Sequence, residues 1–147
     1  MTKTPQEGVK IVRVVNFLTS VVAFVGMLLP WLNVGGQRLN FFQIIYKSIS
    51  VTNSFQDVLK WLNPTYSANL LTFFLLFAAI FMIIAGASWG ILAHRSGPLI
   101  GLLGVFLFIM LVWYAYGQNF VSLFQFGIGV TALSYLIGLL FGGGEKL

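Results

Sequence analysis

Few residues in this chain carry side chains suited to acid/base, nucleophilic or metal chemistry. The three carboxylates, Glu7, Asp57 and Glu145, fall in predicted tails or loops, so they make no pair for acid/base catalysis or a metal site. His94 is the single histidine and stands beside Arg95, where an interfacial or lipid-headgroup role is expected before a ligand role. Cysteine is absent, which excludes disulfides and thiolate chemistry. We therefore expect no enzymatic activity, no metal and no cofactor.

Two polar side chains lie within the first apolar segment. Asn16 and Ser20 are one helical turn apart and so share a face. Either they line a path for an ion or substrate, or they bond to a neighbouring helix, and the second use is the commoner one in membranes. Proton-coupled transporters place an acid or a histidine at such depth, and this chain has none there.

The elements that must position these residues are apolar. Of the 147 residues 59% are hydrophobic and only 7% charged, too few charges to build a water-soluble surface. Apolar segments at about 11–32, 70–93, 99–116 and 120–141 each approach the roughly 20 residues that a helix needs to cross a bilayer. The sequence thus predicts one domain over residues 1–147, an all-α integral membrane protein with a bundle of four transmembrane helices.

The positive charges predict the orientation of this bundle. Five of the eight fall on the side of the termini and the second loop: Lys3, Lys10, Arg13, Arg95 and Lys146. Three fall in the first loop: Arg38, Lys47 and Lys60. The protein is expected in the cell membrane, and the positive-inside rule then puts both termini in the cytoplasm. Aromatic residues expected as interface anchors at the outer ends are Trp31, Trp113, Tyr114 and Tyr116. The net charge of +5 is spread without clusters, so we expect no nucleic-acid partner.

The first loop, residues 33–69, is the one sizeable part predicted outside lipid. Gly35-Gly36 suits a two-residue hairpin turn, because glycine tolerates positive φ angles. Ser54-x-x-Asp57 resembles a capping box, and the apolar residues after it predict a short amphipathic helix that ends before Pro64. The segment 41–46 is apolar enough to pack on the bundle, as either strand or helix. For contact with a partner the loop offers Asp57, Lys60 and Trp61.

Small residues recur along three of the predicted helices and predict close helix contacts. The second and third helices carry Gly86, Gly90, Gly97, Gly101 and Gly104. The fourth carries Gly127, Thr131, Ser134 and Gly138 on one face. Such faces serve either packing within the chain, which we favour, or an interface with a second copy or another subunit.

The order of these parts resembles the claudin and peripheral-myelin-protein superfamily of tetraspan proteins. The passage from Leu29-Pro30-Trp31 into Leu32-Asn33-Val34-Gly35-Gly36 is similar to the step from first helix to extracellular sheet in that family. The Gly-Leu-Trp motif and paired cysteines of the claudin loop have no counterpart here. The resemblance implies four spans, cytoplasmic termini and an outer loop that contacts partners.

These observations favour a non-enzymatic tetraspan protein that acts as a structural, assembly or accessory subunit. Its expected partners are the lipid bilayer and other membrane proteins or copies of itself. Two alternatives stay open: a small oligomeric channel or transporter, and a cofactor-free subunit of a respiratory or photosynthetic complex.

Overall fold

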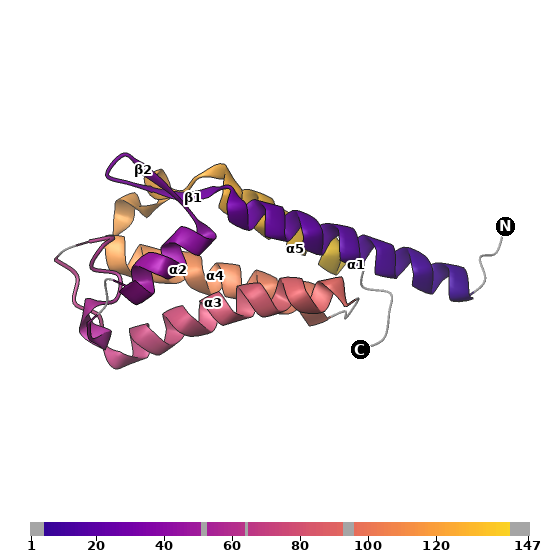
Figure 1. Cartoon of the computed structure of the whole chain (residues 1–147), viewed down its shortest axis with the longest axis horizontal. Helices are drawn as coiled ribbons and strands as arrows, with labels where there is room; N and C mark the ends of the chain where they lie inside the picture. Colours follow the sequence, from indigo (N-terminus) through magenta and orange to yellow (C-terminus); the bar gives the residue numbers. More distant parts are fainter. Residues whose placement is uncertain (1–4, 51–52, 64, 93–95, 142–147) are drawn as a thin grey trace.

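The structure is mostly helical, and four long helices pack side by side. The computed structural model describes residues 5–50, 53–63, 65–92 and 96–141. The four helices are α1 (Pro5–Leu28), α3 (Leu70–Ile91), α4 (Ser96–Tyr116) and α5 (Phe126–Phe141). Helix α1 lies beside α5, and α3 lies beside α4 (Figure 1). Contacts of α1 with α3 and of α4 with α5 close the bundle.

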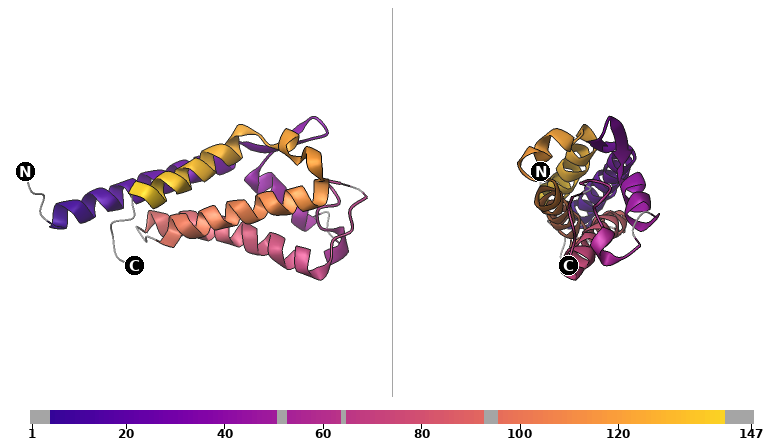
Figure 2. Two further views of the ribbon diagram at one scale, coloured as in Figure 1. Left: turned by 180° about the vertical axis from the view of Figure 1, so that it is seen from behind. Right: turned by 90° about the vertical axis from the view of Figure 1, so that its left-hand side faces the viewer.

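The two helix pairs are not parallel. They lie close together where α3 ends and α4 begins, and they diverge toward the other end (Figure 2). The strands, the helix α2 (Phe41–Ser50) and the 3₁₀ segments η1 (Phe55–Asp57) and η2 (Gln118–Leu123) gather at the divergent end. We call this the hairpin end, and the other the narrow end.

Three predicted helix boundaries differ from the structure by four residues or more, and the first of them is the start of α1 at Pro5 instead of residue 11. The first helix ends at Leu28 instead of residue 32, because proline disfavours helical backbone in the residue before it and Pro30 opens a strand. The fourth helix begins at Phe126 instead of residue 120. Gly117 has a φ of 101° and ends α4, and the chain then makes the six-residue segment η2 before α5 starts.

The hairpin that the glycine pair predicts is present. Strand β1 (Pro30–Val34) pairs antiparallel with β2 (Gln37–Asn40). Gly35 and Gly36 form the turn with φ angles of 61° and 83°, which side chains rarely tolerate. The Gln125 amide donates to the Trp31 carbonyl at 2.8 Å, so β1 is also attached to the segment that precedes α5.

The segment 41–46, whose state the sequence leaves open, is the start of helix α2. A reciprocal cap marks the start of this helix. The backbone N–H of Gln43 donates to the side-chain oxygen of Asn40 at 2.8 Å, and the backbone N–H of Asn40 donates to the side-chain oxygen of Gln43 at 2.9 Å. One face of α2 is buried through Phe41, Ile44 and Ser48.

The prediction of an amphipathic helix between Ser54 and Leu62 is wrong. Only one 3₁₀ turn forms, at Phe55–Asp57, and Val58 after it is already extended. Leu59 has a φ of 65°, a conformation that no helix continues through. The apolar side chains of Val58, Leu59 and Leu62 are nevertheless buried, so their burial is satisfied by a turn instead of a helix face.

Aromatic side chains fill the space between the diverging helices. The Trp31 ring lies 4.8 Å from that of Phe41 in α2 and 5.6 Å from that of Phe108 in α4, measured between ring centroids. Its indole Nε1 donates to the Gly26 carbonyl at 2.8 Å. Trp31 is fully buried, so its predicted place at the membrane interface is wrong, whereas Trp113, Tyr114 and Tyr116 are exposed.

Candidate functional site

The outer faces of the four long helices form an apolar outer surface. Large hydrophobic side chains point outward from all four long helices, for example Leu18, Phe81, Phe106 and Leu133, which are 55%, 70%, 57% and 59% exposed. Among the described residues, α3 and α4 are the two helices long and apolar enough to cross a membrane. In both, only 39% of the most apolar stretch is buried within the protein, unlike the core helix of a water-soluble domain. The apolar parts of α1 (Val14–Leu28) and α5 are shorter.

The charged groups lie apart from this surface. Arg38 is on β2, Lys47 on α2, and Asp57 and Lys60 on the loop after it, so every charged side chain that the structure describes belongs to the hairpin end. Lys47 lies 3.3 Å from the side-chain oxygen of Gln37 and joins α2 to β2. The described molecule is therefore polar at one end and apolar along its sides.

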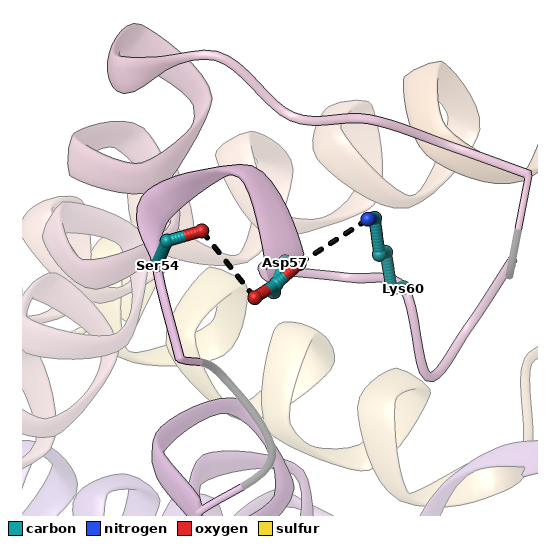
Figure 3. Close-up of polar contacts among 3 residues, drawn as sticks. All are labelled: Ser54, Asp57 and Lys60. Carbon is teal, nitrogen blue, oxygen red and sulfur yellow. Dashed lines mark hydrogen bonds and ion pairs between the residues drawn. The ribbon is translucent and has the colours of Figure 1, made fainter.

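Asp57 and Lys60, two of the residues predicted to contact a partner, pair with each other. Their side chains are 3.2 Å apart, and the Ser54 hydroxyl donates to the other oxygen of Asp57 at 3.3 Å (Figure 3). The hydrogen bond from Lys60 holds the pKa of the exposed Asp57 carboxyl below its ordinary value. Both side chains are solvent-accessible, at 42% for Lys60 and 28% for Asp57, so the pair is available at the surface.

Trp61, the third such residue, is partly buried against the core. Its indole Nε1 is shielded from solvent and has no hydrogen-bond partner among the described residues. Part of its surface is therefore used in packing against the core.

Of the predicted glycines of α3 and α4, Gly86, Gly97 and Gly104 face the other helix of this pair, while Gly90 faces Ser20 of α1 and Gly101 faces Tyr135 of α5. A Cβ on Gly86 would come within 2.5 Å of the Gly101 backbone, and a Cβ on Gly97 within 2.6 Å of the Gly90 amide. A Cβ on Gly104 would come within 2.9 Å of Met82 and 3.0 Å of Ile83, both on α3. This face is occupied by packing within the chain.

The small residues of α5 also face inward. A Cβ on Gly127 would come within 2.5 Å of the Pro30 carbonyl, and one on Gly138 within 2.8 Å of the Thr19 hydroxyl. The Thr131 hydroxyl donates to the Ala23 carbonyl of α1 at 3.2 Å. Ser134 is buried but donates to Val130 in its own helix, at 2.7 Å.

Tyr135 joins three helices and was not singled out from the sequence. From α5 its ring lies against Gly101 of α4, and its hydroxyl donates to the Ile83 carbonyl of α3 at 2.5 Å. The side chain is 1% exposed. The signal in the sequence was a phenol beside Ser134 in the small-residue stripe, since a buried tyrosine hydroxyl usually finds a partner.

Asn16 and Ser20 are both buried on the face of α1 that meets α3. Ser20 lies directly against Gly90, close enough that a Cβ on that glycine would clash with its hydroxyl. The arrangement places this polar pair at a helix contact. His94, Arg95 and Glu145 lie outside the described residues, and so does the side chain of Glu7.

The described residues contain no group of three or more metal-ligating side chains. No protein-family model matches the chain, and neither a curated protein nor a solved structure matches it significantly.

Proposed function

We propose that this chain is a multi-pass protein of the cell membrane in which α1, α3, α4 and α5 cross the bilayer. The observation that carries the proposal is the separation of surfaces. Large apolar side chains point outward from all four helices, while the described charges gather at the hairpin end. Water would penalise such a surface, and hydrocarbon would not.

Helix lengths support the proposal. At 1.5 Å per residue, α3 with 22 residues and α4 with 21 extend about 31–33 Å, close to the hydrocarbon thickness of about 30 Å. Helix α5 has 16 residues and extends about 24 Å. Exposed Val121 in η2 extends the apolar surface of α5 toward the hairpin end. Local thinning of the bilayer accommodates the remaining difference between the length of α5 and the hydrocarbon thickness.

The orientation follows the lysines and arginines. We place the termini in the cytoplasm and the hairpin end outside, because five of the eight positive residues belong to the side of the termini. The resemblance to claudins stays a prediction, and no residue role is taken from it.

Within this frame we propose a non-enzymatic role as a structural, assembly or accessory subunit that binds other membrane proteins at the hairpin end. A path through one copy is disfavoured, since Trp31, Tyr135, Phe41 and Phe108 fill the interior. A path between copies along Asn16 and Ser20 is disfavoured too, since that face packs on α3.

The contact residues that we propose are the partly exposed Asp57 and Lys60, together with the solvent-facing apolar side of α2. That face carries Phe42, Tyr46 and Ile49, which are 42%, 72% and 60% exposed. Aromatic residues are enriched in protein–protein interfaces, and the rim of such an interface is polar.

Native purification with mass spectrometry of co-eluting proteins tests this role. The double variant Asp57→Ala/Lys60→Ala should keep its folded yield, because an exposed ion pair contributes little to stability. It should lose a fixed set of co-eluting membrane proteins. The matched control, Gln118→Ala/Asn119→Ala, changes two exposed uncharged residues of η2 and should retain that set. Identical co-eluting proteins for both variants and the wild type would overturn the assignment of the contact.

A further inference from the structure

A groove opens between the first turns of α3 and the last turns of α4. Its volume is about 270 Å³. Leu71 and Leu75 line it from α3, and Met110 and Leu111 line it from α4. None of the described residues that line the groove is charged, so it suits an uncharged occupant.

The rim of the groove is polar, but its hydrogen bonds are made within the protein. The Asn69 side-chain oxygen accepts from the Thr72 amide at 2.8 Å and from the Thr72 hydroxyl at 2.9 Å. The Tyr66 hydroxyl donates to Thr72 at 3.3 Å. The groove therefore offers apolar contact below a rim at which Asn69 and Thr72 are hydrogen-bonded within the protein.

The position of the groove matches the boundary between headgroups and hydrocarbon. Leu75 is five residues past the start of α3, and Met110 is six before the end of α4, so the groove reaches about 8–9 Å along the helices. Trp113 and Tyr114 flank it and are 51% and 65% exposed, as is common for aromatic residues at this boundary. Exposed Leu71 and Met110 make the groove continuous with the apolar outer surface.

We propose that this groove binds one acyl chain of a bilayer lipid from the leaflet on the hairpin side, along the part of the chain nearest the headgroup. The inference rests on the proposed membrane location. The volume is nearly twice that of an apolar cavity of about 150 Å³ that accepts a benzene molecule, which suits a short length of hydrocarbon chain.

Photocrosslinking in vesicles of phosphatidylcholine tests this directly. One probe lipid carries a diazirine near the acyl carbonyl, and a second carries it near the terminal methyl. The carbonyl-proximal probe should label the peptides with Leu71 and Met110 above all other peptides, and the methyl-end probe should not. Met110→Trp and Leu71→Trp, made separately, should each reduce this labelling several-fold by filling the groove.

Leu103→Trp is the matched control, because Leu103 is also on α4 and is 50% exposed, against 51% for Met110. It should leave groove labelling unchanged. Equal labelling of all outward helix faces, unaffected by Met110→Trp and Leu71→Trp, would overturn the groove while leaving the membrane location intact. Extraction of the protein by alkaline carbonate, with labelling on no helix, would instead overturn the membrane location itself.

Discussion

The narrow end and the hairpin end of the bundle hold their helices together by opposite means. At the narrow end glycines permit close contact both within a helix pair, as Gly86 does with Gly101, and between pairs, as Gly90 does with Ser20. At the hairpin end the helices diverge, and the large rings of Trp31, Phe41 and Phe108 fill the space. Close helix approach and space filling therefore fail in different ways. Added atoms should break the first, and removed atoms the second.

The largest effect is expected from Gly86→Leu. Its Cβ would lie 2.5 Å from the backbone of Gly101, and backbone cannot move aside unless α3 and α4 separate. Overpacking typically costs about 1–3 kcal/mol, and more where main chain must shift, so we expect folded protein to be lost. Size-exclusion chromatography in detergent measures this. Gly129→Leu is the control, since Gly129 is exposed with no atom within 4 Å of its Cβ position, and it should elute as the wild type does.

Trp31→Ala should break the hairpin end. It removes a fully buried indole and its bond to the Gly26 carbonyl, and large-to-small changes of aromatic core residues cost about 3–5 kcal/mol. Thermal unfolding in detergent should show a large fall in the melting temperature. Trp113→Ala, at an exposed indole of α4, is the control and should change it little. Equal falls for both variants would contradict the packing described for Trp31.

Tyr135→Phe tests the contact between the two helix pairs, because Tyr135 of α5 contacts both α3 and α4. The ring would still lie against Gly101, while the bond to the Ile83 carbonyl would be lost. A net loss of about 0.5–1.5 kcal/mol is expected for one hydrogen bond, and more if the carbonyl stays unsatisfied. Denaturant titration of Tyr135→Phe measures it. Tyr114→Phe, at an exposed ring, should be neutral.

The smallest effect is expected from Asp57→Asn. The pKa of Asp57 is lowered in the folded protein, so its contribution is present above the unfolded pKa of about 4 and is lost as the pH falls through the folded value. The melting temperatures of wild type and Asp57→Asn should therefore differ slightly at neutral pH and converge in acid. A difference that grows as the pH falls would contradict the pairing of Asp57 with Lys60.

Much of the helical layout could be predicted because apolar length and small-residue spacing are properties of one helix at a time. That Gly86 and Gly127 face inward depends on where the neighbouring helices lie, and the spacing of residues along one helix does not specify this. The loop was harder. The spacing of Asn40 and Gln43 is typical of a helix cap and is visible in the sequence. The positive φ of Leu59, in contrast, has no sequence signal, because leucine rarely adopts this conformation.

Trp31 shows why the exposure of a side chain could also be predicted wrongly from the sequence. A tryptophan at the end of an apolar segment is typical of a membrane interface, yet here the chain turns into β1 and carries the indole between the helices. Burial of that kind depends on where the hairpin and α2 pack, which is a tertiary property. The same holds for Tyr135, whose partner is 52 residues away in the chain.

The most direct test of the central claim is the accessibility of single cysteines introduced into this cysteine-free chain. Gln37→Cys and Gln118→Cys replace exposed residues of the hairpin end, and Gly144→Cys lies near the C-terminus. An impermeant maleimide on intact cells should label the first two, and Gly144→Cys only after permeabilisation. Labelling of Gln37→Cys and Gln118→Cys from opposite sides of the membrane, or of Gly144→Cys alone on intact cells, would contradict the account.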